Sequence, residues 1–251
     1  MSPKLSQVLL KDENWIDRCI STVPPARFGL EWACGSGALT VSLLDRWDYL
    51  FGMELDFSFC CQLKKIVPQD RGSIICTDIK NYPLPKLDQP YPLVGNLPYH
   101  LTGPLLMKIL SAGPKISRFQ GLVQKEVGDR LKASPGDSDF GSLSLLYNVC
   151  GQIKVHFAVP ASAFFPEPGV DSAWIDFIPE PNSYNFDKLK MFARKVFQQP
   201  RKTLLNNLAS SGENKDFWRQ WFVENDLSPT VRPHQLPVET MMEVFEEWQK
   251  S

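Results

Sequence analysis

The sequence predicts an α/β fold: a doubly wound, mostly parallel sheet of seven strands, followed by a small domain made only of helices. Up to about residue 180, short apolar runs rich in β-branched and aromatic residues alternate with helical patterns, as a parallel sheet requires. After the proline-rich segment 179–181 the strand pattern stops and only helical patterns follow. We therefore expect one domain over residues 1–181 and a helical domain over residues 182–251.

The expected elements alternate along the first domain. Strands are predicted at residues 28–32, 49–54, 73–76, 92–96, 119–124, 154–159 and 172–178. Helices are predicted between them at residues 38–45, 57–67, 103–111, 125–133 and 142–150. In the second domain, helices are predicted at residues 186–197, 202–209, 217–225 and 238–249, with Pro237 where a first turn tolerates a missing N–H. Seven strands fit a doubly wound sheet with an extra hairpin.

Length and composition favour an ordered globular protein. The chain has 251 residues, of which 43% are hydrophobic and 22% charged, enough to bury a substantial core. The apolar run 8–10 meets Lys11 and Asp12 at once, so it is too short for a signal peptide. No other stretch approaches the ~20 apolar residues of a membrane span. We expect a cytoplasmic protein without a membrane partner, and a monomer, because no helix carries a sustained coiled-coil repeat.

Six cysteines and three histidines form no metal-binding pattern. No two cysteines stand in C-x-x-C spacing, so we expect no metal site and predict buried, reduced thiols. The net charge of −1 does not by itself suggest a nucleic-acid partner, because proteins that contact phosphates usually carry an excess of Lys and Arg. Any basic surface that contacts nucleic-acid phosphates must therefore be confined to a small part of the protein.

Three successive strand ends carry groups that suit an adenosine. The first ends in the segment Glu31-Trp-Ala-Cys-Gly-Ser-Gly37, where Gly35 and Gly37 let the backbone turn and approach a ligand closely. The second ends about 20 residues later at Glu54, which could accept hydrogen bonds from ribose hydroxyls, and the third ends near Asp78, which could accept one from an adenine amine. A G-x-G-x-x-G phosphate cradle is absent, which favours S-adenosylmethionine over a nicotinamide cofactor. A plain tight turn and solvated strand-end charges are the structural alternatives.

The most specific feature is the tetrapeptide Asn96-Leu-Pro-Tyr99 at the end of the fourth strand. An adenine N6 is a poor nucleophile because its lone pair is delocalised into the ring. The side-chain oxygen of Asn96 and the carbonyl of Leu97 could accept both amine hydrogens and direct the lone pair at a methyl group, without a general base. Pro98 would stiffen the loop, and Tyr99 offers a face on which a flipped-out base can stack. The tetrapeptide resembles the [DNS]-x-P-[YFW] motif of N6-adenine and related amino methyltransferases.

Further motifs resemble one family, the small-subunit ribosomal RNA adenine dimethyltransferases of the KsgA/RsmA type. They are Gln124-Lys-Glu-Val127, Phe140-Gly-Ser-Leu-Ser144, Val159-Pro-Ala-Ser-Ala-Phe164, Pro166-Glu-Pro-Gly-Val-Asp-Ser172 and Phe197-Gln-Gln-Pro-Arg-Lys-Thr-Leu204. They occur in family order and cover nearly the whole chain. The resemblance implies a Rossmann-like class I methyltransferase that uses S-adenosylmethionine. It also implies N6,N6-dimethylation of two adjacent adenosines in the 3′-terminal hairpin of 16S rRNA, within the small ribosomal subunit or its precursor, and a role in subunit biogenesis.

The resemblance also implies roles for individual residues. Glu54 would bind the cofactor ribose, Asp78 its adenine, and Asn96 the methyl-accepting amine. The implied catalytic set is Asn96, Leu97, Pro98, Tyr99 and Phe164, with Tyr99 and Phe164 enclosing the target adenine. The implied cofactor-binding set is Val8, Leu10, Glu31, Ala33, Gly35, Gly37, Glu54, Asp78 and Asn96. The best candidates for RNA phosphate contacts are Lys125, Arg130, Arg201 and Lys202, although such clusters are often only solvated faces.

The chain departs from the family pattern at Val8, Leu9, Ala33 and Pro200, and two of these positions belong to the expected cofactor-binding set. Val8 stands where the N-terminal signature, matched here by Gln7, Leu10 and Asp12, usually has a polar residue. Ala33 stands at the first glycine of E-x-G-x-G-x-G, where its methyl group could crowd the ligand or force a small shift. These departures leave open a ribosome-assembly or RNA-binding factor with weakened catalysis. An amino methyltransferase acting on DNA or protein is a third hypothesis, because the Asn-x-Pro-Tyr site suits any planar amine.

Overall fold

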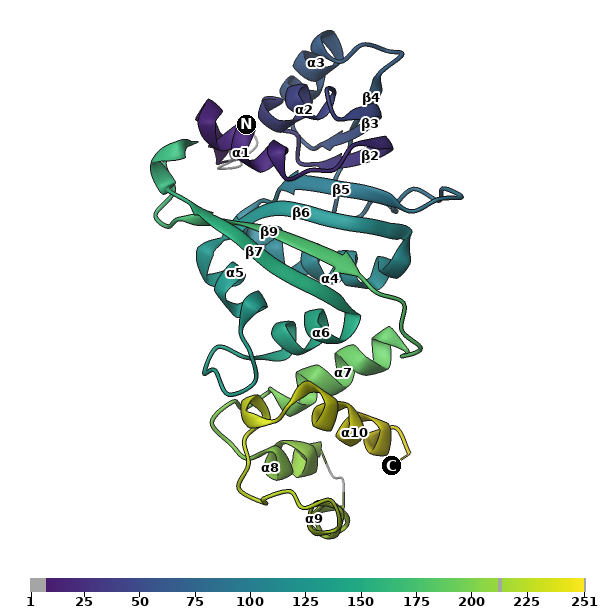
Figure 1. Ribbon diagram of the computed structural model, residues 1–251, viewed down its shortest axis with the longest axis vertical. Helices are drawn as coiled ribbons and strands as arrows, with labels where there is room; N and C mark the ends of the chain where they lie inside the picture. The colour runs from purple at the N-terminus through teal and green to yellow at the C-terminus, as the bar shows by residue number, and fades with distance from the viewer. Residues whose placement is uncertain (1–7, 212–213, 251) are drawn as a thin grey trace. The chain divides into compact units, whose positions relative to one another are not determined.

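The computed structural model describes residues 8–211 and 214–250, and its chain divides into two compact units. Gln7, a match to the N-terminal signature, lies outside the described residues. One unit contains the chain up to Gly128 together with Gln152–Glu180, and the other contains Asp129–Gly151 and the chain from Pro181 onward. The elements, all but β1 and β8 labelled in Figure 1, are β1 (Leu9–Leu10), α1 (Glu13–Ser21), β2 (Ala26–Trp32), α2 (Ala38–Leu43), β3 (Trp47–Glu54), α3 (Phe57–Ile66), β4 (Gly72–Cys76), β5 (Tyr91–Asn96), α4 (Thr102–Ala112), β6 (Ile116–Gln124), α5 (Lys125–Lys132), α6 (Ser142–Cys150), β7 (Gly151–Val159), β8 (Phe164–Phe165), β9 (Ser172–Pro179), α7 (Phe186–Val196), α8 (Leu204–Leu208), α9 (Lys215–Glu224) and α10 (Val238–Trp248).

The first unit is built on a seven-stranded sheet in the order β4-β3-β2-β5-β6-β9-β7. The pairs from β4 to β6 are parallel, and β9 runs antiparallel to β6. The first strand of this sheet along the chain is β2. The next two strands, β3 and β4, are added outward on one side of it, and β5 then pairs on its other side. Ligands of such sheets bind at the carboxyl ends of the strands, where the strand order reverses. The predicted seven-stranded, mostly parallel sheet is therefore confirmed.

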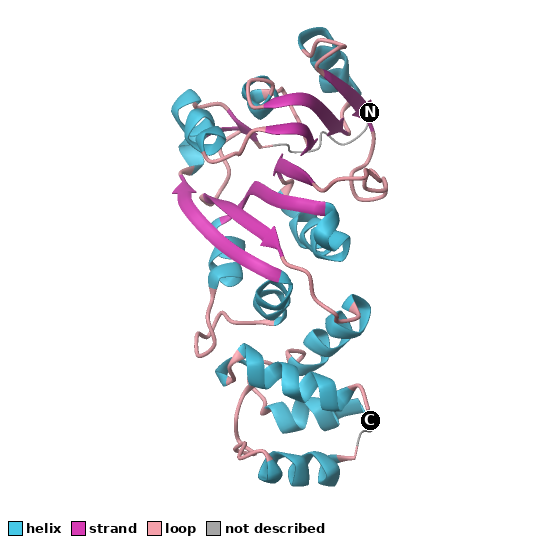
Figure 2. Cartoon of the chain, turned by 45° about the vertical axis from the view of Figure 1, so that its right-hand side comes forward, coloured by secondary structure: helices cyan, strands magenta, loops and turns pink. Residues whose placement is uncertain are grey.

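The central strands are buried on both faces. Neighbouring side chains along a strand point to opposite faces of the sheet. Almost complete burial is nevertheless found for Leu93 and Val94 on β5 and for Phe119 and Leu122 on β6, so both faces are covered. Helices pack around these strands, as Figure 2 shows. Burial on both faces explains why the central strands appear in the sequence as nearly continuous apolar runs.

Two elements before β2 were not predicted from the sequence. Helix α1 begins after Asp12, whose carboxylate accepts the N–H groups of Asn14 (3.0 Å) and Trp15 (3.3 Å), a favourable N-cap. The two-residue strand β1 pairs antiparallel with β8. This pairing fixes the start of the described chain against the loop that precedes β9.

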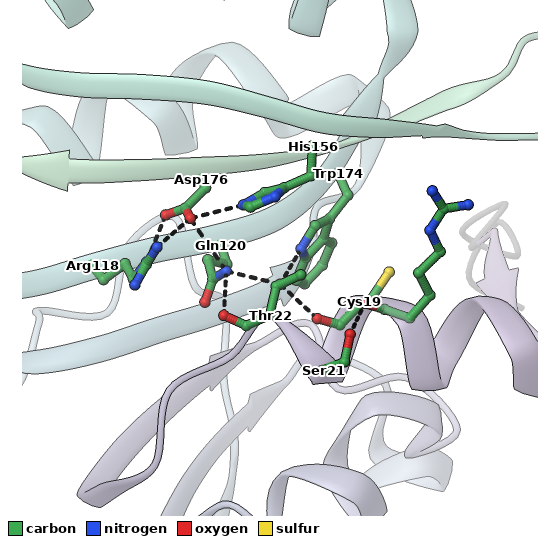
Figure 3. Close-up of polar contacts among 9 residues, drawn as sticks. Cys19, Ser21, Thr22, Arg118, Gln120, His156, Trp174 and Asp176 are labelled. Atoms are coloured by element: carbon green, nitrogen blue, oxygen red, sulfur yellow. Dashed lines mark hydrogen bonds and ion pairs between the residues drawn. The ribbon is translucent and has the colours of Figure 1, made fainter.

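A polar network joins the end of α1 to the sheet (Figure 3). Gln120 on β6 donates to the Thr22 hydroxyl (3.0 Å), and the Trp174 indole N–H on β9 donates to the same oxygen (2.9 Å). Asp176, also on β9, accepts two hydrogen bonds from Arg118 at 2.7 and 2.5 Å. Buried polar groups are retained when they find partners. The network therefore holds α1, and with it the adjacent β1, in a fixed place on the sheet.

In the second unit the described residues form helices and loops, apart from Gly151 at the start of β7. Helix α6 packs against α7, and nearby the rings of Phe140 and Phe197 meet edge to face at 6.0 Å. The sequence assigned residues 129–151 to the first domain, whereas the structure groups them with the C-terminal helices. The reason is that the apolar side chains of α6 find their partners on α7 and α10.

The described residues contain no helix long and apolar enough to cross a membrane. Nor do residues 8–211 and 214–250 contain a group of three or more His, Cys, Asp or Glu that could hold a metal ion. All six cysteines are free thiols, and four are buried. Cys61 and Cys76 are exposed, so the prediction of burial is wrong for these two.

Candidate active site

A cavity of about 370 Å³ lies at the carboxyl ends of β2, β3, β4 and β5. A cavity of this size can hold a small-molecule ligand or cofactor. Predicted site residues line it from all four strand ends: Val8, Ala33, Gly35, Glu54, Asp78, Asn96, Leu97, Pro98 and Tyr99. Sequence reasoning missed other residues of the wall: Leu9, Leu55, Ile79, His100, Leu101, Pro168 and Gly169. Most of these residues are direct chain neighbours of predicted ones. They could have been predicted by extending the expected site by one residue at each strand end.

The loop after β2 has a left-handed backbone at three positions. Ala33, Gly35 and Gly37 have φ angles of 55°, 54° and 94°. A side chain at Gly35 would also collide with Leu9, because an added Cβ would lie 2.7 Å from its Cδ2. Glycine adopts this conformation without strain, whereas an L-residue pays roughly 1–2 kcal/mol. Ala33 is therefore a strained position in the wall of the cavity.

Replacing Ala33 with glycine is expected to stabilise the protein and to bind the cofactor at least as tightly as the parent. The gain is about 1 kcal/mol or less, because glycine also increases the entropy of the unfolded chain. Thermal unfolding should show a Tm higher by roughly 2–4 °C for each kcal/mol gained. Ala38→Gly is the control, because Ala38 lies in helix α2, where glycine is unfavourable and should lower the Tm. Equal losses of Tm in the two variants would contradict the assignment of strain to Ala33.

Glu54 ends β3 with its carboxylate held by backbone donors. One carboxylate oxygen accepts the Gly35 N–H at 2.7 Å, and the other accepts the Leu55 and Asp56 N–H groups, both at 2.8 Å. The residue is 1% exposed and lines the cavity. These contacts fix a carboxylate at the wall and attach the loop after β2 to β3. A fixed carboxylate is suited to accept hydrogen bonds from ribose hydroxyls.

Asp78 follows β4 and is ordered by its own loop. Its two oxygens accept the Lys80 N–H at 2.8 Å and the Asn81 side-chain amide at 2.9 Å. The next residue, Ile79, adds an apolar side chain to the wall. The Thr77 N–H donates to the Glu54 carbonyl at 2.7 Å, which keeps the two acidic residues close together. A carboxylate beside an apolar side chain suits the amine edge and the ring face of an adenine.

Asn96 is oriented by a backbone contact. Its side-chain nitrogen lies 2.9 Å from the Val8 carbonyl oxygen, and because a carbonyl can only accept, the NH₂ group must face Val8. The amide oxygen then points away from Val8 and accepts no hydrogen bond from the described part of the chain. The Leu97 carbonyl also accepts none there, whereas the Pro98 carbonyl accepts the Leu101 N–H at 2.8 Å. Two acceptors are therefore available where the tetrapeptide lines the cavity.

Val8 contributes through its backbone rather than its side chain. The family signature usually has a polar residue at this position, but the contact with Asn96 needs only the main-chain carbonyl of Val8. The departure at Val8 therefore leaves the orientation of Asn96 intact.

Tyr99 supplies an aromatic face to the cavity. It begins a short 3₁₀ helix (Tyr99–Leu101), and its hydroxyl lies 2.7 Å from the Ser172 hydroxyl at the start of β9. Burial raises the pKa of the Tyr99 phenol above its ordinary value of 10.0, so the ring is neutral at physiological pH. The ring is thus held at both ends in a position where a base could stack.

Phe164 is not among the residues that line the cavity, and the expected enclosure of the target adenine by Tyr99 and Phe164 stays a prediction. Strand β8 pairs Phe164 with Leu10 and Phe165 with Leu9. Because side chains alternate along a strand, one phenylalanine of the pair must be buried and the other exposed. Phe164 is 0% exposed within the core, and Phe165 is 66% exposed. The sequence alone does not show which of two adjacent phenylalanines points inward.

Leu10, Gly37 and Glu31, expected at the cofactor, lie outside the cavity lining. Leu10 is a core residue, and an added Cβ on Gly37 would lie 3.0 Å from Leu63 rather than from a ligand. Glu31 is 1% exposed, and its Oε2 has no hydrogen-bond partner in the described chain. Burial raises the pKa of the Glu31 carboxyl to about 7, against the opposing effect of the Thr40 hydroxyl. These three residues therefore support the wall of the cavity without forming part of its surface.

Glu31 is expected to make the protein less stable as the pH rises towards and through 7. Below pH 4.5 both states hold the proton, but between 4.5 and about 7 only the folded state does, so raising the pH favours unfolding. The full loss is on the order of 3 kcal/mol above pH 7. Urea unfolding of Glu31→Gln should show a flatter pH dependence between pH 5 and 8, with greater stability than the parent at pH 8. An unchanged pH dependence, equal to that of the exposed-residue control Glu13→Gln, would contradict this role.

The four predicted phosphate contacts are exposed. Lys125 opens α5 in the first unit, whereas Arg130, Arg201 and Lys202 belong to the second. Their exposure is compatible with RNA contacts, and the role of each stays a prediction.

The fold and the cavity together define an S-adenosylmethionine-dependent methyltransferase. Residues 1–250 match the family described as ribosomal RNA adenine dimethylase. The chain belongs to this family, so it is a ribosomal RNA adenine dimethyltransferase, and the resemblance seen in its motifs is confirmed.

Curated relatives and solved structures agree with this assignment. Ribosomal RNA small subunit methyltransferase A of Dechloromonas aromatica is 31% identical over 247 residues, which cover 96% of this chain and 95% of that protein. The protein of the same name from Thermotoga maritima is 32% identical over 253 residues, covering 98% and 85%. A dimethyladenosine transferase from Plasmodium falciparum superposes with a TM-score of 0.83 at 25% identity, covering 96% and 98%. The 23S rRNA methyltransferase ErmE, at 20% identity, 96% and 99% coverage and a TM-score of 0.72, shows the same fold.

Proposed function

We propose that the protein transfers methyl groups from S-adenosylmethionine to N6 of two adjacent adenosines in the 3′-terminal hairpin of 16S rRNA, giving N6,N6-dimethyladenosine. The observation that carries the proposal is the orientation of Asn96, whose NH₂ group faces the Val8 carbonyl and whose oxygen is left to accept a substrate hydrogen. Support for the small-subunit substrate comes from the relatives, which are named for that subunit and align over nearly the full length of both chains.

The residues of the cavity fit the cofactor. Glu54 offers a fixed carboxylate for the ribose, Asp78 and Ile79 offer an acceptor and an apolar face for the adenine, and the Gly35 N–H holds the Glu54 carboxylate in place. When bound, S-adenosylmethionine supplies an electrophilic methyl group. Val8, Leu10, Glu31, Ala33 and Gly37 complete the proposed cofactor set, either in the wall or behind it.

The chain's own residues would activate the amine by position. The Asn96 oxygen and the Leu97 carbonyl each accept one N6 hydrogen, which favours a pyramidal nitrogen with its lone pair directed at the methyl carbon. Tyr99 stacks on the base, and Pro98 limits movement of the loop. As the nitrogen–carbon bond forms, the methyl–sulfur bond of the cofactor would break with its electron pair kept by sulfur, leaving S-adenosylhomocysteine. The methylated nitrogen is cationic and strongly acidic, so water or one of the two carbonyl oxygens takes its proton. No general base is needed before attack.

The proposed partner is the small ribosomal subunit or its precursor, with Lys125, Arg130, Arg201 and Lys202 as contacts to RNA phosphates. Their long, exposed, cationic side chains suit contacts that position an RNA without reading its sequence. We propose that the protein acts in the cytoplasm as a monomer and takes part in subunit biogenesis.

The decisive experiment is methyl transfer from labelled S-adenosylmethionine to small ribosomal subunits that lack these methyl groups, followed by nucleoside analysis. N6,N6-dimethyladenosine in the 3′-terminal hairpin is the expected product. Label on another RNA, or none on any RNA, would overturn the proposal.

One observation favours a second candidate, a ribosome-assembly or RNA-binding factor with weakened catalysis. The strained backbone of Ala33 lies in the cavity wall, where a weaker fit to the cofactor would slow transfer. Binding to the small subunit together with cofactor binding but no transfer would support this candidate. The family match favours RNA over DNA or protein as the methyl acceptor.

A further inference from the structure

Lys108, in the second turn of α4, has its ammonium group surrounded by carbonyls of one loop. The nitrogen donates to the carbonyl oxygens of Ile79 at 2.6 Å and Lys80 at 3.2 Å, and to that of Tyr82. It also lies 5.6 Å from the centre of the Trp32 ring. A lysine ammonium has three donors, and here one loop provides an acceptor for each.

The same loop forms the part of the cavity proposed to bind adenine. Asp78 and Ile79 line the cavity, and the Asp78 carboxylate accepts hydrogen bonds from Lys80 and Asn81 within the loop. The loop is therefore held twice, by the Asp78 carboxylate and by the Lys108 ammonium. If the second attachment is lost, three carbonyls lose their donor and Asp78 and Ile79 lose their fixed position.

Lys108 also connects this loop to the catalytic tetrapeptide. Helix α4 starts at Thr102, whose hydroxyl donates to the Pro98 carbonyl at 3.2 Å. The Trp32 ring next to the ammonium belongs to the last residue of β2, directly before Ala33. A single side chain thus contacts segments at the ends of β2 and β4 from the helix that follows β5.

The ammonium group of Lys108 is partly buried. Burial lowers the pKa of the ammonium below its ordinary value of 10.5, and the nearby Asp78 carboxylate acts in the opposite direction. A neutral side chain of similar length could fill the same volume without that desolvation cost. The carbonyl contacts are therefore the feature that requires a lysine here.

We propose that Lys108 is a positioning residue for the nucleoside part of the cofactor, holding Asp78 and Ile79 where the adenine binds. The inference rests on the proposed assignment of this cavity to S-adenosylmethionine. Lys108 does not line the cavity, so its effect is indirect and should fall on cofactor affinity rather than on the chemical step.

The test compares Lys108→Met with Lys80→Met by calorimetric titration of S-adenosylmethionine and S-adenosylhomocysteine. Both changes remove one positive charge from the same region, but the Lys80 side chain is exposed and makes none of these contacts. We expect Lys108→Met to raise both dissociation constants by the same factor, about tenfold, the equivalent of 1.4 kcal/mol. At saturating cofactor its kcat should stay within about twofold of the parent, because the acceptors at Asn96 and Leu97 are unchanged. Lys80→Met should bind like the parent.

A second readout separates positioning from general destabilisation. Hydrogen–deuterium exchange at residues 77–83 should be faster in Lys108→Met than in the parent, with exchange in β5 and β6 unchanged. Lys108→Arg, which keeps the charge and several donors, should recover part of the affinity. If Lys108→Met does not fold, Lys108→Gln is judged by the same criteria.

The outcomes distinguish this inference from the proposed function. A parent protein that binds no S-adenosylmethionine would overturn the proposed function. If the parent binds, the inference fails when Lys108→Met binds equally well or when Lys80→Met loses as much affinity. It also fails if Lys108→Met lowers kcat at saturation while leaving both dissociation constants unchanged.

Discussion

Asn96→Ala is expected to lower kcat for methyl transfer by roughly 10²–10³-fold, the usual effect of removing one preorganised polar contact to a reacting group. The variant loses the side-chain oxygen that accepts an amine hydrogen, so the nitrogen lone pair stays delocalised in the adenine ring. The dissociation constant of S-adenosylmethionine should change little, because Glu54 and Asp78 are untouched. Single-turnover transfer to unmethylated small subunits, combined with cofactor titration, measures both quantities.

Asn96→Asp is the matched control. It keeps the size of the side chain and an acceptor oxygen, but it cannot donate to the Val8 carbonyl, which lies 2.9 Å from the present amide nitrogen. Its rate should fall between those of the parent and Asn96→Ala, because the acceptor remains while its orientation is weakened. Parental turnover by Asn96→Ala would exclude the proposed role of this side chain.

Most of the fold could be predicted from the sequence because its signals are local. The apolar runs of the central strands are long enough to be recognised, and the rule for strand ends in parallel sheets then brings Gly35, Glu54, Asp78 and Asn96 together. Strands β1 and β8 were missed because two residues carry no periodicity. Helix α6 was predicted, but its pattern shows only that one face is apolar, not which helices that face meets.

The parts of the site that could not be predicted depend on backbone geometry and on distant contacts. The left-handed backbone conformation of Ala33 could not be predicted, because alanine as a residue type does not favour positive φ angles. The Val8 contact with Asn96 joins residues 88 positions apart in sequence through a main-chain carbonyl, for which side-chain type gives no signal. The burial of Phe164 and the exposure of Phe165 follow from the register of β8 against β1.

Glu54→Gln is expected to weaken S-adenosylmethionine binding by about 100-fold or more and to lower the Tm. The carboxylate now accepts three backbone N–H groups at 2.7–2.8 Å, and hydrogen bonds to a charged acceptor are worth roughly 1.5–3 kcal/mol each. A glutamine has one acceptor oxygen, so its NH₂ group must face at least one N–H of Gly35, Leu55 or Asp56. That donor is buried without a partner, and the loop after β2 loses its attachment to β3.

Asp56→Asn is the control for Glu54→Gln. It also removes one negative charge from this region, but it leaves the Glu54 carboxylate in place. Asp56 caps helix α3 through Ser58, at 2.7 Å to its N–H, and it does not line the cavity. The variant should therefore bind S-adenosylmethionine like the parent and unfold at most slightly earlier, because asparagine is also a good N-cap. If Glu54→Gln is folded at the assay temperature and still binds with the parental dissociation constant, the ribose is held elsewhere. A loss of affinity confined to Glu54→Gln would instead assign ribose recognition to a carboxylate whose geometry is fixed before the cofactor arrives.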